Sequence, residues 1–255
     1  MLLVIDVGNT NTVLGLYDGE ILKNIWRITT ENNVTSDEIG INIHSLFDNS
    51  GLNIDCLEGV IISSVVPNIM YSFTQGIRKY LGIEPMIVGA GIKTGIAIRR
   101  DNPKEVGADR IVDLVAAKEI YGFPVIVIDY GTANTFDVLN EKGEFITGFI
   151  SPGIKICADA LYSRAAKLPK IEIKKPDSII AKNTVKSLQT GLVMGHIGQT
   201  LYIIDYLKKG LNMPNMKVVA TGGLAKVIDP DNTIFDIYDP ALTLKGLRLI
   251  FEKNR

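Results

Sequence analysis

The chain carries the segment Asp6-Val7-Gly8-Asn9-Thr10-Asn11-Thr12 and, in its second half, the matching segment Asp129-Tyr130-Gly131-Thr132-Ala133-Asn134-Thr135. Asp, Gly, Asn and Thr occupy the same places in both copies without a gap. Each copy lies between two runs that are typical of β-strands, and the second run ends at a turn at Gly19-Glu20 or at Gly143-Glu144. A repeat of this size indicates two related halves. A small polar loop in each half predicts one ligand held from both sides.

The composition is that of an ordinary globular protein. The chain has 255 residues, of which 46% are hydrophobic and 22% are charged, so one large or two medium domains can form a sizeable core. The 27 basic and 28 acidic residues leave a net charge of −1, which argues against nucleic-acid binding. No apolar stretch approaches the roughly 20 residues that span a bilayer, and no signal peptide is visible. We therefore expect a cytoplasmic protein that binds neither nucleic acid nor a membrane.

Cysteine, histidine and lysine residues form no recognisable site in the sequence. Cys56 and Cys157 lack the spacing of a metal site, and we expect both to be reduced thiols. His44 and His196 are too isolated for a histidine metal site or a catalytic triad, so we expect structural roles for them. A short basic cluster is expected to form a solvated face, and it consists of Lys170, Lys174 and Lys175.

Hydrophobic periodicity predicts an α/β fold in which each half opens with three strands. In the first half we expect strands at 2–6, 12–17, 21–28, 59–66 and 85–88, and helices at 36–49 and 68–81. Ser36 is the expected N-cap of the helix at 36–49. Residues 89–104 are expected to form a loop, and a helix at 105–121 to link the halves. In the second half we expect strands at 125–129, 136–139, 144–150 and 216–220, and helices at 153–166, 183–209 and 242–253.

The loop after Asp6 has the composition of a phosphate site. Small residues let backbone N–H groups approach phosphate oxygens, and Thr and Asn side chains add donors. A carboxylate would repel phosphate unless a cation lay between them, so Asp6 predicts a divalent metal, bound directly or through water. The alternative is a hairpin whose Asp and Asn side chains only satisfy a turn. The presence of two copies favours the ligand site.

A third glycine-rich turn follows the strand expected at 216–220. Gly222 and Gly223 would let a purine lie against the backbone at the start of a helix, although such turns are common in α/β folds. The nucleotide-binding patterns GxGxxG and GxxxxGK[ST] are both absent from the sequence.

The segment Gly107-Ala108-Asp109-Arg110 lies at an expected loop-to-helix boundary between the halves. An Asp near a helix N-terminus stays ionised and can accept a proton from a substrate hydroxyl. The neighbouring Arg can bind a carboxylate or stabilise phosphoryl charge. The alternative is that Asp109 only caps the helix and that Arg110 is a surface residue.

Together these segments resemble the type III pantothenate kinases, a family of the acetate and sugar kinase, Hsp70 and actin superfamily. The resemblance extends over almost the whole chain, and its specificity comes from the conjunction of segments in the family's order. The segments are DVGNTNTVLGLYDG at 6–19, NPKEVGADRIVD at 102–113, DYGTANTFDV at 129–138, ISPGIKI at 150–156, NTVKSLQTG at 183–191 and TGGLA at 221–225.

The resemblance implies ATP-dependent phosphorylation of pantothenate to 4'-phosphopantothenate, the first step of coenzyme A biosynthesis. It also implies two duplicated ribonuclease H-like (actin-like ATPase) domains, each with a mixed sheet, and a cleft between them. We place the domains at 1–115 and 116–255, with packing of the last helix on the first domain as the alternative. Members are homodimers with the substrate site near the subunit interface.

The resemblance further implies roles for individual residues. By this resemblance Asp109 corresponds to the family's general base. Asp6 corresponds to a ligand of Mg²⁺, directly or through water, and Asp129 to the ligand of a monovalent cation, K⁺ or NH₄⁺. The pantothenate-binding positions are Gly107, Ala108, Asp109, Arg110 and Thr184. The ATP-binding positions are Asp6, Val7, Gly8, Asn9, Thr10, Asn11, Thr12, Val13, Thr132, Gly222 and Gly223.

One position departs from the family's pattern. Relatives usually have Tyr before the Asp-Asn-Pro run, where this chain has Arg100. Arg100 is a further substrate-binding candidate that either pairs with the pantothenate carboxylate or points to solvent, and we expect the latter. Two alternatives to the pantothenate kinase stay open: a kinase for another small hydroxy acid, and a catalytically weak regulatory protein of the same fold. The intact Asp6, Asp109, Arg110 and Asp129 favour an active enzyme.

Overall fold

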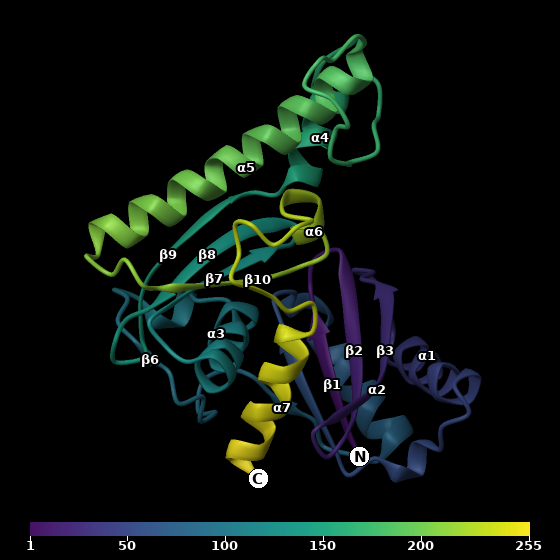
Figure 1. Ribbon diagram of the computed structural model, residues 1–255. Coiled ribbons are helices and arrows are strands. Elements are labelled where there is room, and N and C mark those ends of the chain that lie inside the picture. Colours follow the sequence, from purple (N-terminus) through teal and green to yellow (C-terminus); the bar gives the residue numbers. More distant parts are fainter. The chain divides into compact units, whose positions relative to one another are not determined.

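The computed structural model describes residues 1–255, which divide into two compact units (Figure 1). The first unit consists of Met1–Ile96, Asn102–Ala116 and Leu242–Arg255. The second unit consists of Ala97–Asp101 and Ala117–Ala241. Each unit contains one β-sheet with helices packed on it, and the C-terminal helix belongs to the first unit.

A five-stranded mixed sheet in the order β3-β2-β1-β4-β5 forms the centre of the first unit. β1 pairs antiparallel with β2 and parallel with β4, and its register places Asp6 beside Ser63 of β4. Val and Ile make up three of the six residues in each of β1 and β4, as is common in strands buried on both faces. The strands are β1 Leu2–Val7, β2 Asn11–Asp18, β3 Ile21–Thr29, β4 Gly59–Ser64 and β5 Met86–Ile87.

Alternating side chains along β1 pack against different helices on the two faces of this sheet. Leu3, Ile5 and Val7 share a core with residues of α1 and α2, whereas Val4 packs with residues of α3 and α7. Asp6 follows the same alternation and therefore lies on the α3 face. The helices are α1 Ser36–Asn49, α2 Met70–Leu81, α3 Ala108–Tyr121 and α7 Leu242–Asn254, with short 3₁₀ turns at Ile54–Cys56, Pro67–Ile69 and Pro103–Glu105.

A capping box begins α1. The Thr35 hydroxyl accepts the N–H of Glu38 at 3.3 Å, and the Glu38 carboxylate accepts the N–H of Thr35 at 2.8 Å. The prediction of Ser36 as N-cap is therefore wrong by one residue, because only Thr35 has a Glu three positions later to complete the box.

Close contact between α7 and α3 depends on a glycine. A Cβ at Gly246 would lie 2.2 Å from the carbonyl oxygen of Val112, so a larger residue could not occupy this position without moving the helices. Leu244, Leu247 and Ile250 of α7 are buried beside this contact. The last helix thus completes the core of the unit that the first strand begins.

A six-stranded mixed sheet in the order β11-β10-β7-β8-β9-β6 forms the centre of the second unit. β7, β8 and β9 form an antiparallel meander, while β10 lies parallel to β7 on the other side. The two-residue strand β6, parallel to β9, falls in the segment that we expected to be a loop, because two residues are too few to show periodicity. The strands are β6 Ala97–Ile98, β7 Val125–Tyr130, β8 Ala133–Leu139, β9 Glu144–Pro152, β10 Lys217–Thr221 and β11 Ile237–Tyr238.

A 27-residue helix, α5 (Thr184–Gly210), runs along the second sheet (Figure 1). Val193, Ile204 and Leu207 of α5 share a core with Tyr130 and Phe136 of the sheet. The other helices of this unit are α4 Ile154–Arg164 and α6 Ala225–Ile228. None of the helices in the structure has the length and hydropathy of a membrane-spanning segment.

The predicted fold class is confirmed in both halves. Each half begins with three antiparallel strands, and each sheet is mixed, as the repeated segment indicated. The two copies of the segment both connect the first strand of a meander to the second.

Candidate active site

Asp6 lies near the carboxyl end of β1, beside a tight hairpin loop. The N–H of Gly8 donates to the carbonyl oxygen of Asn11 at 3.1 Å and closes this loop. Asn9 and Thr10 are exposed at the tip of the loop. The side chains of Val7 and Thr12 are buried, and that of Val13 is partly buried. Residues whose side chains turn inward could offer a ligand only their backbone groups.

The carboxylate of Asp6 is partly buried, and its pKa is raised. Burial raises the pKa of Asp6 to about 6 from its ordinary value of 3.8, and the nearby negative charge of Asp109 raises it further. A hydrogen bond from the Ser63 hydroxyl to Oδ1, 2.5 Å long, acts in the opposite direction. Asp6 and Asp109 thus interact electrostatically within one unit.

Asp109 lies in the first turn of α3 and folds back on its own backbone. Its Oδ1 accepts the N–H of Arg110 at 2.7 Å. Burial is the main cause that raises the pKa of Asp109, while this bond and the charge of Arg110 act against it. A Cβ on Gly107 would lie 2.5 Å from Oδ1, so glycine at this position makes room for the carboxylate. The segment Gly107 to Arg110 therefore holds one oxygen of the Asp109 carboxylate in place.

Asp129 occupies the equivalent place in the second unit, at the end of β7. The N–H of Gly131 donates to the carbonyl oxygen of Ala133 at 3.2 Å, so this hairpin also closes at its glycine, although one residue earlier than in the first copy. A Cβ on Gly222 would lie 2.5 Å from both Asp129 Oδ1 and the carbonyl oxygen of Tyr130. A carboxylate oxygen and a carbonyl oxygen thus converge beside the same glycine.

Gly222 and Gly223 connect β10 to α6 beside this hairpin. Gly222 has φ +90°, a conformation that favours glycine, and its carbonyl oxygen accepts the Tyr238 hydroxyl at 3.4 Å. Gly223 is exposed. Thr132 is also exposed, and its carbonyl oxygen accepts the N–H of Gly153 at 3.2 Å. The structure therefore brings Asp129, Thr132 and the glycine turn together in one unit.

Thr184 is the exposed first residue of α5, beside a pocket of about 440 Å³. The predicted solvated face is confirmed, because Lys170, Lys174 and Lys175 are all exposed. The same three lysines and Lys186 also line this pocket. Two of them form long ion pairs, Lys174 with Glu172 at 3.9 Å and Lys175 with Asp231 at 3.8 Å. Sequence spacing gave no signal for this pocket, because it depends on how the 165–183 segment lies against the start of α5.

Arg100 does not point freely into solvent. Its guanidinium lies over the ring of Phe145, 5.6 Å from the centroid, and donates to the carbonyl oxygen of Gly148 at 3.3 Å. The expectation of a solvent-directed side chain is therefore wrong, because an aromatic ring and a carbonyl oxygen lie within reach on β9. The neighbouring Arg99 instead pairs with Glu144 at 2.7 Å.

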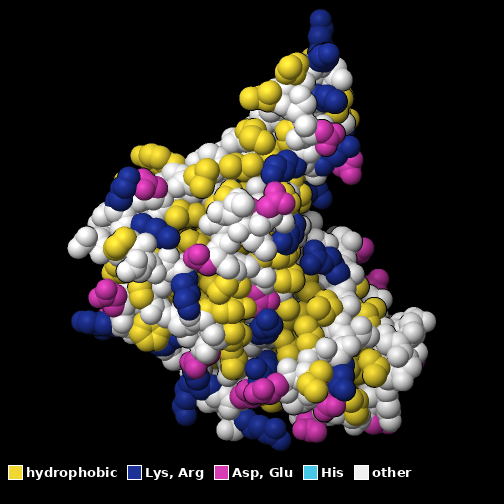
Figure 2. Space-filling view, viewed as in Figure 1, with side chains coloured by type: hydrophobic (Ala, Val, Ile, Leu, Met, Phe, Trp, Pro, Cys, Tyr) yellow, Lys and Arg dark blue, Asp and Glu magenta, His cyan; other side chains and the backbone are white.

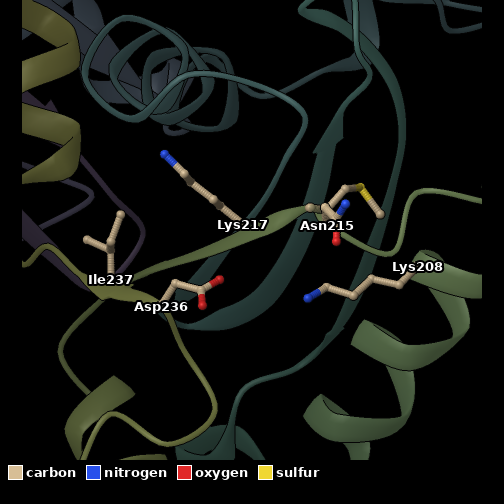
Figure 3. A pocket seen from close by; sticks show the side chains of 6 residues that line it. Lys208, Asn215, Lys217, Asp236 and Ile237 are labelled. Carbon is tan, nitrogen blue, oxygen red and sulfur yellow. The ribbon is translucent and has the colours of Figure 1, made fainter.

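An open pocket of about 460 Å³ lies elsewhere in the second unit, where α5 ends and β10 begins (Figure 3). The side chains of Lys208 and Asp236 are directed toward one another there, and Lys217 is directed away (Figure 3). Asp236 accepts the N–H of Val218 at 2.7 Å, and Lys217 donates to the carbonyl oxygen of Tyr121 at 2.8 Å. None of the predicted site residues lines this pocket, so we do not include it in the active site.

Ser63 is a site residue that sequence reasoning missed. It is completely buried in β4, and its hydroxyl bonds to Asp6. The available signal was a pair of serines inside the otherwise apolar run GVIISSVV at 59–66. The pairing of β1 with β4 was needed to show which acidic residue this serine would meet.

Two units, each with an Asp beside a polar hairpin, have the arrangement of the actin-like ATPase fold. A solved protein from Sinorhizobium meliloti, described as a 2-dehydro-3-deoxygalactonokinase, matches 99% of this chain and 96% of its own at 12% identity, with a TM-score of 0.62. The activator of 2-hydroxyisocaproyl-CoA dehydratase from Clostridium difficile, solved with bound ADPNP, matches 99% and 96% at 12% identity, with a TM-score of 0.51. At such identities the likeness shows the fold alone.

Sequence similarity defines the family within this fold. Residues 2–206 match the family described as Type III pantothenate kinase. Proteins with that name from Agathobacter rectalis and Halalkalibacterium halodurans are 53% and 51% identical over 254 residues, covering 100% of this chain and 98% and 100% of theirs. The chain belongs to the type III pantothenate kinase family.

The raised pKa of Asp6 predicts a stabilising substitution. The folded chain binds the proton of the Asp6 carboxyl more tightly than the unfolded chain does. Ionisation of Asp6 therefore lowers the free energy of unfolding increasingly as the pH rises from about 4 to about 6, and by a constant amount above that. In metal-free buffer at pH 7.5 we expect Asp6→Asn to unfold less readily, by about 1 to 3 kcal/mol, and the gain to vanish as the pH falls to 4.

Urea unfolding with EDTA across this pH range measures the effect. Asp48→Asn, which removes an exposed carboxylate of the same unit, is the matched control. If Asp6→Asn is less stable than the parent at pH 7.5, ionised Asp6 does not destabilise the fold and the inference is wrong.

Proposed function

We propose that this chain transfers the terminal phosphoryl group of ATP to the primary hydroxyl of pantothenate, with Asp109 as general base and Asp6 as the carboxylate at Mg²⁺. Membership of the family supports pantothenate kinase activity with ATP, the step that begins coenzyme A biosynthesis. The assignment of roles depends on one observation: Asp6 and Asp109 are two partly buried, interacting carboxylates of the same unit. The use of ATP also supports a cytoplasmic location.

Asp109 has the properties of a general base. Its raised pKa makes the carboxylate a stronger proton acceptor near neutral pH than an exposed Asp would be. The bond from the Arg110 N–H holds Oδ1, which leaves Oδ2 to accept the proton of the substrate hydroxyl. Gly107 keeps the space beside this carboxylate open. The guanidinium of Arg110 lies next to the base and can stabilise developing phosphoryl charge.

Asp6 has the properties of a magnesium ligand. Mg²⁺ typically binds one or two carboxylates together with substrate phosphates, so a large cluster of acidic residues is not needed. The structure holds no group of three or more His, Cys, Asp or Glu residues that could bind a metal, which fits this mode of binding. Asp6 stands beside the exposed Asn9 and Thr10, whose polar groups suit phosphate oxygens. When bound, Mg²⁺ neutralises phosphate charge.

In the second unit we assign Asp129 to a monovalent cation. Asp129 Oδ1 and the Tyr130 carbonyl oxygen converge beside Gly222, and hard cations prefer such oxygen ligands. Thr132, exposed in the same hairpin, is assigned to the ATP phosphates, and the turn at Gly222 and Gly223 to the nucleotide.

The carboxylate of pantothenate requires a positively charged partner. The lysine-lined pocket beside Thr184 supplies such a field, and Thr184 adds an exposed hydroxyl. Arg100 retains further donors after its one bond to Gly148, so it can also meet a carboxylate. We therefore assign Thr184 and Arg100 to substrate binding.

Phosphoryl transfer needs positioning and charge neutralisation more than covalent help. Asp109 accepts the hydroxyl proton while the substrate oxygen bonds to the terminal phosphorus of ATP, and the bond to the leaving ADP breaks. The two alternatives, another hydroxy acid as substrate or a regulatory protein, gain no support from relatives more than 50% identical that carry the pantothenate kinase name.

We also propose that the chain forms a homodimer through α5. Gly191, Gly195 and Gly198 share one exposed face of α5, and a Cβ on any of them would meet no atom within 4 Å. Each glycine inside a helix lowers stability by about 1 kcal/mol relative to alanine. Three glycines on one face are therefore best explained by close packing against another helix. Large exposed hydrophobic side chains lie along α5 as well, in particular Met194, Leu201, Tyr202 and Tyr206.

Figure 2 shows hydrophobic side chains gathered over α5, where Figure 1 draws that helix. A soluble monomer seldom exposes a continuous apolar surface of this kind. A second copy of the same face is the proposed occupant, because a two-fold axis brings identical glycine faces together.

Asp109→Asn should abolish phosphorylation without weakening ATP binding. The amide keeps the shape of the side chain but cannot accept the proton, so we expect kcat/KM for pantothenate to fall at least about 1000-fold. A coupled assay of ADP release gives the rate, and calorimetry gives the affinity for ATP. Asp101→Asn, an exposed carboxylate, is the control. Near-parental turnover by Asp109→Asn would refute the base assignment.

Asp129→Ala should remove the response to monovalent cations. We expect the parent to be several-fold faster in K⁺ than in Na⁺ at equal ionic strength, because Asp129 is the charged ligand of the cation. The variant should be slow and equally slow in both salts. If Asp129→Ala keeps full activity and the same preference for K⁺, the cation lies elsewhere.

Gly195→Leu should convert the dimer to a monomer. The new side chain meets open space in one copy, so the fold is retained and only a close-packed partner helix is displaced. Light scattering after size exclusion measures the mass. Gly210→Leu, at the far end of the same helix and equally open, is the control. A Gly195→Leu protein that stays dimeric would exclude this face as the interface.

A further inference from the structure

Ser63 makes a direct bond to the carboxylate at the candidate magnesium site. Its hydroxyl donates to Asp6 Oδ1 at 2.5 Å, the length of a charge-assisted hydrogen bond. The two residues are paired neighbours in the parallel register of β1 and β4. The bond therefore rests on two central strands of a sheet and not on a loop.

The surroundings of Ser63 offer its hydroxyl no hydrogen-bond partner other than Asp6. Ser63 is completely buried, and its strand neighbours Val60, Ile61 and Ile62 are apolar and equally buried. A buried hydroxyl costs free energy unless it is hydrogen-bonded, so an apolar residue would serve the core at least as well. The only bond of the Ser63 hydroxyl is the one to Asp6, which indicates a role in the site.

The bond holds one oxygen of the carboxylate and leaves the other unused. Oδ1 of Asp6 is occupied by Ser63, and Oδ2 makes no hydrogen bond within the protein. The terminal torsion of an Asp side chain is soft, so an unsupported carboxylate would sample a broad range of orientations. Mg²⁺ requires nearly ideal octahedral geometry and is therefore sensitive to such freedom.

We propose that Ser63 is a positioning residue that fixes the Asp6 carboxylate so that Oδ2 can receive Mg²⁺, directly or through water. This inference rests on the proposed role of Asp6 in metal binding. Ser63 itself does not contact substrate. Its action is to select one orientation of the carboxylate against the repulsion from Asp109.

Metal binding and steady-state kinetics of Ser63→Ala test the inference. In the intact protein with ATP, Mn²⁺ binding followed by electron paramagnetic resonance should weaken about tenfold, and the Mg²⁺ concentration for half-maximal rate should rise by a similar factor. The KM for pantothenate should stay within twofold, which a general loss of structure would not allow. Ser63→Thr, which restores the hydroxyl on a side chain suited to a strand, should recover metal binding.

Two further variants make the outcomes distinguishable. Ser64→Ala removes a hydroxyl from the next residue of β4, which bonds to the N–H of Val66 at 3.0 Å and not to Asp6, and should bind Mn²⁺ as the parent does. If Ser63→Ala fails to fold, Ser63→Cys keeps the volume with a weak donor and should show the same loss of metal affinity.

Unchanged Mn²⁺ binding in Ser63→Ala, alongside weakened binding in Asp6→Asn, would overturn the positioning role alone. Unchanged binding in Asp6→Asn would overturn the metal assignment of Asp6 and the inference with it. Equal losses in Ser63→Ala and Ser64→Ala would show a general effect of β4 and also overturn the proposal.

Discussion

Two interacting, partly buried carboxylates set the main constraint on the first unit. Asp6 and Asp109 both lose hydration, and their mutual repulsion raises the cost of ionising them. The Ser63 hydroxyl and the Arg110 N–H offset part of this cost with one hydrogen bond each. A cation between the carboxylates and a bound phosphate would offset more. The carboxylates whose ionisation costs free energy are thus those assigned to chemistry, as expected where function and stability compete.

The duplication supplies a similar hairpin twice, with different surroundings. The N–H groups of Gly8 and Gly131 both close their loops, by bonds to Asn11 and to Ala133, so the second loop is the tighter one. The first carboxylate lies near another acid, whereas Asp129 converges with a backbone carbonyl oxygen beside Gly222. Their neighbours, more than the hairpin itself, therefore separate a proposed divalent-metal site from a proposed monovalent-cation site. Family membership fits this division of roles, because ATP-dependent transfer to pantothenate requires neutralised phosphates.

Much of the fold could be predicted from the sequence, because its strands and helices have strong periodicity. The repeated segment revealed two related sheets, and the positions of α1, α5 and α7 were predicted to within two residues. The N-cap of α1 was misplaced, since a capping box depends on a pair of residues and not on Ser36 alone. β6 was missed because its only partner, β9, is distant in the sequence.

The site was predictable where its residues form a local motif, and not where it depends on distant contacts. Asp6, Asp109 and Asp129 each stand in a recognisable segment. Ser63 became visible only through strand register, and the lysine pocket only through the path of the chain before α5. Arg100 was misjudged because Phe145 and the Gly148 carbonyl oxygen are brought beside it by β6 and β9 pairing.

Phosphorus NMR of the complete reaction tests the central claim most directly. The purified chain is incubated with ATP, Mg²⁺, K⁺ and pantothenate, and the phosphorus signals are followed with time. The account predicts that one phosphomonoester of pantothenate appears for each ADP formed. Release of ADP with inorganic phosphate and no new ester, or no consumption of ATP, would contradict it.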